Sequence, residues 1–180
     1  MSEIVKYMKE RKWADDDKAE RSMYLFKLAQ QSREQEEVSH KIGGMLIYNQ
    51  VIEEFLKDII ELSVNYIKAE IWPVDVCLNV DFSKLTFGKL ISEFKQYATK
   101  EYNRELLLEY LHKYNLKRNE VVHHLFKIND LDKLAVELDE YTFIADEIIF
   151  LLVEYLNCIC EKFCDLDRRV DFSDFADFDK

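Results

Sequence analysis

One short segment, Arg118 to His124, places a guanidinium, an amide and two imidazoles within seven residues. On a helix, at about 100° per residue, Asn119 and His123 lie about 40° apart, whereas His124 is about 100° from His123. A guanidinium binds phosphate through paired hydrogen bonds, and an imidazole transfers protons near neutral pH. The segment therefore predicts a phosphodiester site in which Arg118, Asn119 and His123 act together.

The same helical projection places Arg118 in the middle of an apolar stripe. The stripe is formed by Val121, Val122, Leu125 and Phe126. Burying a guanidinium is costly unless an anion or several acceptors meet it. Two interpretations stay open: a substrate phosphate meets Arg118, or the residue is structural. A structural arginine would extend its charge to solvent or pair with a carboxylate such as Glu54 or Glu140.

The composition predicts one all-α domain. The chain has 180 residues, only 3 glycines and 1 proline, and 48% hydrophobic residues. Folds rich in turns or phosphate-binding loops need more glycine, which argues against sandwiches, barrels, Rossmann folds and P-loops. The net charge of −11 disfavours a broad nucleic-acid footprint, and we expect no DNA specificity. The nearest local basic patch consists of Lys113, Lys117, Arg118 and Lys127.

We expect three parts along the chain: a charged helical arm over residues 1–40, a helical bundle over 41–165, and a disordered acidic-aromatic tail over 166–180. Within the bundle, apolar spacing predicts helices over 45–70, 87–98, 103–114, 116–127 and 132–164. Thr86 is the expected N-cap of the helix over 87–98. Phe143 is an expected core residue of the helix over 132–164. Gly43-Gly44 indicates a bend or a close contact. Residues 74–82 alternate with a period of two, which favours an ordered loop or a lone extended segment.

The motif resembles that of a known family. Arg118-Asn119-Glu120-Val121-Val122-His123 matches the R-x4-6-H motif of the HEPN superfamily, including the polar residue after the arginine, and 85–90 (LTFGKL) resembles the helix start that often precedes it. The resemblance implies an HEPN-like bundle with a long C-terminal helix, dimeric through the face that bears the motif. It also implies metal-independent RNA cleavage, giving a 2′,3′-cyclic phosphate and a 5′-hydroxyl.

By the family pattern, His123 is the general base on the ribose 2′-hydroxyl, Arg118 stabilises the phosphate charge, and Asn119 positions the phosphate. We expect Lys117 and His124 to bind substrate. The setting implied is a toxin–antitoxin or antiviral defence system, with RNA as substrate and a protein antitoxin as a possible partner. Leu125 occupies the place of a tyrosine that some antitoxins modify, which argues against that type of antitoxin. The alternative is a non-catalytic HEPN module for dimerisation or RNA association.

We expect neither a metal nor a cofactor. Cys158, Cys160 and Cys164 lack an evident fourth ligand for structural zinc. The E-x-x-H pairs needed for a di-iron site occur, but the helical projection aims them away from the core or places them in the polar arm. The first residues lack the apolar region of a signal peptide, and no apolar run approaches the length of a membrane span. These observations predict a cytoplasmic protein with reduced thiols.

Overall fold

The computed structural model describes residues 3–11, 16–74, 76–78, 80–82, 85–99, 103–125, 127 and 130–170. This part of the chain is all-α and contains no strand, which confirms the predicted fold class. Among its helices, none combines the length and the apolar character that crossing a bilayer requires. The described helices are α1 (Glu3–Lys9), α2 (Asp16–Arg33), α3 (Val38–Glu70), α4 (Phe87–Tyr97), α5 (Arg104–Leu125) and α6 (Leu131–Arg169).

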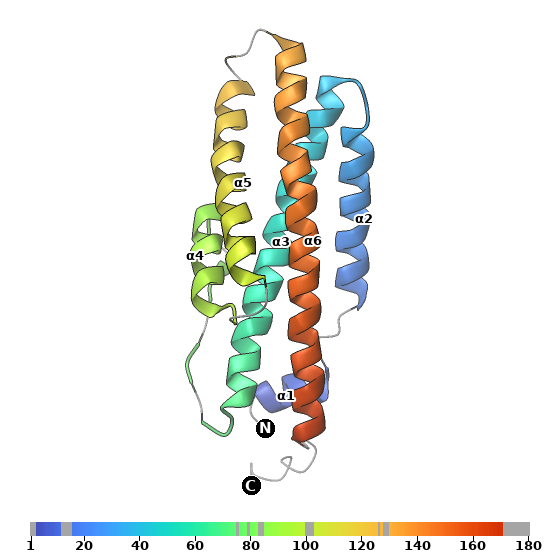
Figure 1. Ribbon diagram of the computed structural model, residues 1–180. Coiled ribbons are helices and arrows are strands. Elements are labelled where there is room, and N and C mark those ends of the chain that lie inside the picture. The colour runs from blue at the N-terminus through green and yellow to red at the C-terminus, as the bar shows by residue number, and fades with distance from the viewer. Residues whose placement is uncertain are drawn as a thin grey trace.

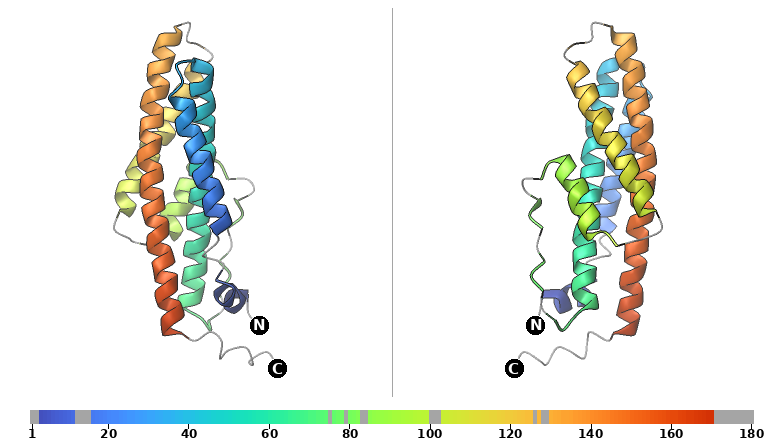
Figure 2. Two further views of the ribbon diagram at one scale, coloured as in Figure 1. Left: turned by 90° about the vertical axis from the view of Figure 1, so that its right-hand side faces the viewer. Right: turned by 60° about the vertical axis from the view of Figure 1, so that its left-hand side comes forward.

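The two longest helices, α3 and α6, form the centre of an elongated bundle (Figures 1 and 2). They run in the same direction, and α2 and α5 run in the opposite direction on either side of them (Figure 1). The short helix α4 packs against α3 and α5. The core between these helices is built from large apolar side chains at helical spacing, among them Ile52, Leu56, Ile59, Leu138, Ile148 and Leu152.

Helix α3 begins at Val38 and continues through Gly43 and Gly44 without a break. Gly44 is buried, and a Cβ added there would lie 3.1 Å from the carbonyl oxygen of Ala29 on α2. Of the two expected roles for the glycine pair, Gly44 therefore has the close contact, because its missing side chain lets α2 approach. The helix ends at Glu70, as predicted, shortly before Pro73, which disfavours helical backbone in the residue before it.

The prediction of separate helices over 103–114 and 116–127 is wrong, because α5 is continuous. Its inward residues Leu107, Leu111, Tyr114 and Val121 are all fully buried. Their spacing runs without a shift through Asn115, so packing against α3 and α6 holds the helix together where local propensity favours a break. The R-x-x-x-x-H motif consequently lies in the last third of a long helix, not at the start of a short one.

Helix α6 begins where predicted, because the Asp130 carboxylate accepts hydrogen bonds from the backbone N–H groups of Asp132 and Lys133. It continues past the expected end at Cys164, since Leu166 is still packed in the core. The prediction of Phe143 as a core residue is wrong. Its side chain is 64% exposed, because position 143 lies on the outer side of α6, opposite the buried Tyr141 and Ile148.

The predicted arm over residues 1–40 contains α1, α2 and the start of α3. Helix α2 packs along α3, and Arg33 at its end pairs with Asp146 of α6. Residues 76–78 and 80–81 form no regular element, and Val80 packs partly against the core, as in an ordered loop. Thr86 precedes α4 as predicted, but its side chain makes no capping hydrogen bond. Of the predicted tail, residues 166–169 belong to α6, and residues 171–180 lie outside the described part.

Candidate functional site

Arg118 occupies a core-facing position of α5. It lies between Tyr114 and Val121, both fully buried, and its own side chain is 29% exposed. The helical projection therefore placed the guanidinium correctly: it points toward the interior of the bundle. A charge in this position needs compensation from neighbouring helices.

Two groups compensate that charge. The Arg118 Nη2 atom lies 3.2 Å from Oε1 of Glu53 on α3, and Glu53 is itself only 28% exposed. The guanidinium carbon lies 5.2 Å from the ring centroid of Phe87 on α4, in cation–π geometry. The carboxylate that meets Arg118 is thus Glu53, not Glu54 or Glu140. The internal ion pair supports the structural interpretation of Arg118 without excluding a second anion on the same guanidinium, which has five donors.

A hydrogen-bonded cluster lies one helical turn from this ion pair, along α3 and α5. Asn49 Oδ1 on α3 accepts hydrogen bonds from the hydroxyls of Tyr114, at 2.9 Å, and Tyr141 on α6, at 2.5 Å. The two tyrosine rings are stacked, with centroids 4.7 Å apart. Together with the ion pair, these residues join α3, α4, α5 and α6, and we call them the Arg118 layer: Asn49, Glu53, Phe87, Tyr114, Arg118 and Tyr141.

Burial raises the pKa of both Tyr114 and Tyr141 well above the ordinary value for tyrosine, and the positive charge of Arg118 only partly opposes this. Both phenols are therefore protonated at neutral pH and act as hydrogen-bond donors to Asn49. They hold the layer in place, and neither can serve as a general base under those conditions.

Asn119 and His123 point away from the core. Both side chains are exposed, and their spacing places them on the outer face of α5 together with Leu116, which is also exposed. Arg118 and His123 are about 140° apart around the helix axis, so one chain alone does not bring the guanidinium and the imidazole together. Val122, expected in the buried stripe, is 41% exposed.

The expected basic patch is largely neutralised by carboxylates of the chain. Lys117 Nζ lies 3.1 Å from Oε2 of Glu140 on α6, and Lys113 pairs with Glu109 one turn earlier on α5. Lys127 is exposed. The backbone of His124 belongs to α5, but its side chain lies outside the described residues.

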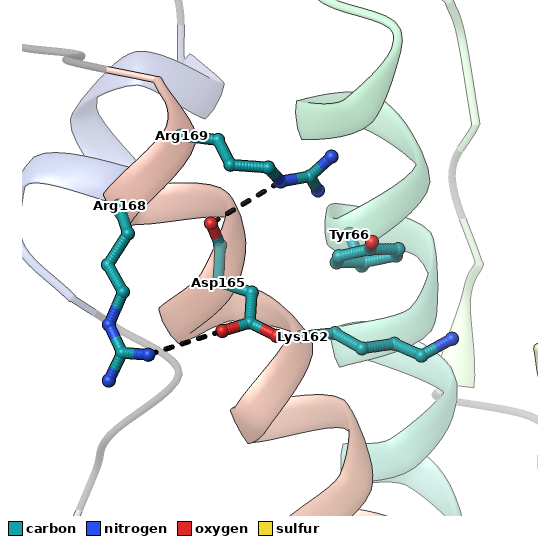
Figure 3. Close-up of a pocket in the computed structure, with 5 residues that line it drawn as sticks. All are labelled: Tyr66, Lys162, Asp165, Arg168 and Arg169. Carbon is teal, nitrogen blue, oxygen red and sulfur yellow. Dashed lines mark hydrogen bonds and ion pairs between the residues drawn. The ribbon is translucent and has the colours of Figure 1, made fainter.

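A second group of charged side chains lies at the opposite end of α6 (Figure 3). A cavity of about 370 Å³ there is lined by Tyr66, Lys162, Asp165, Arg168 and Arg169. Arg169 pairs with Glu70, Arg168 pairs with Asp165, and Lys162 lies over the Tyr66 ring. Each cationic side chain that lines the cavity therefore already contacts an acidic or aromatic side chain of the protein. No group of three or more metal-ligating side chains occurs among the described residues.

Comparisons with models of protein families, with curated proteins and with solved structures found no match to this chain. The candidate site therefore depends on the geometry and on the motif.

Sequence reasoning missed the layer around Arg118. The carboxylates expected as partners of Arg118 do not include Glu53, although Glu53 follows the inward Asn49 by one helical turn. The sequence did contain one indication of this layer: Tyr114 and Tyr141 lie at inward positions of α5 and α6, and a buried phenol requires a hydrogen-bond partner. Spacing alone does not identify which residue of another helix supplies it.

Proposed function

We propose that the chain is a metal-independent endoribonuclease of HEPN type that acts as a homodimer. The observation that supports this most is the position of Arg118. A half-buried guanidinium is held by Glu53 and Phe87, and the residues that follow it in the motif, Asn119 and His123, are exposed on the same helix. This arrangement offers a fixed positive charge and an exposed proton-transfer group on one helix, and a second copy is needed to bring the two kinds of group together.

In the proposed reaction, His123 removes the proton of a ribose 2′-hydroxyl, and the 2′-oxygen attacks the adjacent phosphorus. The bond from phosphorus to the 5′-oxygen breaks, and a proton returns to that oxygen. The products are a 2′,3′-cyclic phosphate and a 5′-hydroxyl. Arg118 stabilises the charge that develops on the phosphate, Asn119 positions it, and Lys117 and His124 contact substrate beside it.

The dimer is part of the proposal because Arg118 and His123 diverge within one chain. The outer face of α5 carries Leu116, Asn119 and His123, and Leu116 is 66% exposed. In the proposed dimer, the two copies meet through α5 so that His123 on this face of one chain lies beside the exposed part of the partner's Arg118, whose side chain is 29% exposed. Burying that contact supplies the water-poor environment in which an arginine stabilises phosphate charge most strongly.

The second candidate is a non-catalytic HEPN-like module for dimerisation or RNA association. One observation favours it: the Arg118–Glu53 ion pair already satisfies the guanidinium with a carboxylate of the same chain. The net charge of −11 also favours the non-catalytic module, because it repels RNA outside a local site.

The test is RNA cleavage in EDTA by the purified chain, with His123→Ala and His112→Ala as a matched pair. Both histidines are exposed on the outer side of α5, but only His123 belongs to the motif. We expect the wild type and His112→Ala to leave 2′,3′-cyclic ends, and His123→Ala to lose at least about 99% of the activity. Equal cleavage by all three, or none by the wild type, favours the non-catalytic module, and sedimentation velocity then shows whether the chain is a dimer.

In a bacterial cytoplasm, the proposed activity predicts slower growth when the wild-type chain is expressed. Expression of His123→Ala at an equal level should restore growth, whereas His112→Ala should not. This pattern is expected of a toxin–antitoxin or antiviral defence component. Equal toxicity of the wild type and His123→Ala contradicts the assignment.

A further inference from the structure

Three large apolar side chains on the outer side of α6 are exposed to solvent. Val136, Phe143 and Phe150 are 58%, 64% and 62% exposed. We call these three residues the α6 stripe. Helix α6 lies in front of α3 in Figure 1, with α5 on one side and α2 on the other. Single exposed apolar residues are ordinary, but three of them aligned on one helix are a feature of docking surfaces.

The three residues of the stripe occupy one position of a heptad repeat. Consecutive members are seven residues apart, so they drift by only about 20° per repeat around the helix and span about 21 Å along it. The stripe matches one face of a partner helix of about four turns.

Carboxylates border the stripe on both sides. Asp139, Glu140, Glu147 and Glu154 are all exposed and lie three or four residues from Phe143 or Phe150. Asp139 pairs with Lys41, and Glu140 pairs with Lys117. Glu147 lies within one helical turn of both Phe143 and Phe150. The surface therefore combines a row of apolar side chains with the negative charge of Glu147 and Glu154, neither of which pairs with a lysine or arginine among the described residues.

We infer that the α6 stripe is the docking site for an amphipathic helix of another protein, with apolar residues at heptad spacing and lysine or arginine beside them. Charge decides between this partner and a second copy of the chain. Two copies paired through the stripe would place Glu147 and Glu154 against like charges, in a protein whose net charge is −11. A basic helix gains both the apolar contact and the charge complementarity. The inference does not depend on the proposed ribonuclease, because none of its residues belongs to the motif on α5.

The experiment uses two fluorescent helical peptides of about three heptads with identical apolar residues, one flanked by lysines and one by glutamates. Fluorescence anisotropy with the full chain should show saturable binding of the basic peptide and none of the acidic one. The double variant Phe143→Ser/Phe150→Ser should weaken binding at least about tenfold, while Phe143→Leu/Phe150→Leu keeps it. Tyr24→Ser, which removes an exposed aromatic from α2, is the control that should bind as the wild type does.

Circular dichroism verifies that the double serine variant keeps its helical content and melting temperature, as expected for exposed positions. Equal binding of both peptides, or unchanged binding by the double serine variant, overturns the inference. It is also overturned if sedimentation velocity shows a wild-type dimer that the double serine variant converts to a monomer, because a second copy then covers the stripe.

Discussion

Two arginines join neighbouring helices to α3, and they do so in different surroundings. Arg118 pairs with Glu53 at 3.2 Å, with side chains 29% and 28% exposed. Arg169 pairs with Glu70 at 2.7 Å, with side chains 59% and 34% exposed. We expect the longer contact to contribute more to stability, because water and salt screen an exposed pair more than a half-buried one.

The residues around the Arg118–Glu53 and Arg169–Glu70 ion pairs also differ. Arg118 lies against Phe87 and above two tyrosines that share Asn49, so four helices meet at one charge. Arg169 lies at the open end of the bundle beside the cavity shown in Figure 3. Removing Asn49 or Arg118 leaves a buried or half-buried polar group without its partner, whereas water replaces a lost contact at the other end.

The largest effect is expected for Asn49→Ala. The substitution removes the acceptor of two buried phenols, and each unsatisfied hydroxyl costs about 1–3 kcal/mol, so the free energy of unfolding should fall by about 2–6 kcal/mol. Urea denaturation measures it. The triple variant with Tyr114→Phe and Tyr141→Phe should recover part of the loss, because no phenol then lacks a partner. A loss under 0.5 kcal/mol for Asn49→Ala, a threshold of about half the usual hydrogen-bond contribution, would show that the layer is unimportant for stability.

An intermediate effect is expected for Arg118→Ala, with Arg169→Ala as its matched control. Removing Arg118 leaves the half-buried Glu53 without its cation, at a cost of about 2 kcal/mol. Arg169→Ala should shift the melting temperature much less. Repeating both in about 1 M NaCl sharpens the comparison, since the small effect at Arg169 should vanish and the effect at Arg118 should persist. Equal losses at low salt contradict the comparison.

The smallest effect is a dependence of stability on pH at Glu70. The Tyr66 hydroxyl donates to Glu70 and, together with Arg169, lowers the pKa of that carboxyl below its ordinary value. A carboxyl with a lower pKa in the folded state stabilises the fold above the unfolded pKa, and this contribution is lost as pH falls through the folded pKa. The melting temperature of the wild type should therefore exceed that of Glu70→Gln slightly at about pH 6 and converge with it near about pH 3. A difference that grows toward low pH would have the wrong sign.

The sequence predicted the all-α class, the inward position of Arg118 and the start of α6, because each depends on local spacing or local chemistry. It did not predict that α5 is one helix, because contacts with α3 and α6 override the weak propensity near Asn115. It wrongly assigned Phe143 to the core, because the residue type is apolar whether the side chain faces the core or, as here, the outer side of the helix. It also missed Glu53 as the partner of Arg118, because pairing between helices depends on their relative rotation.

The most direct test of the central claim is the single-turnover rate of RNA cleavage by Arg118→Ala, measured in EDTA below the unfolding temperature of the variant. The account predicts a folded chain whose cleavage rate falls at least about a hundredfold, because the phosphate loses its stabilising charge. Cleavage at the wild-type rate, despite the lower stability of the variant, would contradict the account and leave Arg118 as a structural ion pair with Glu53.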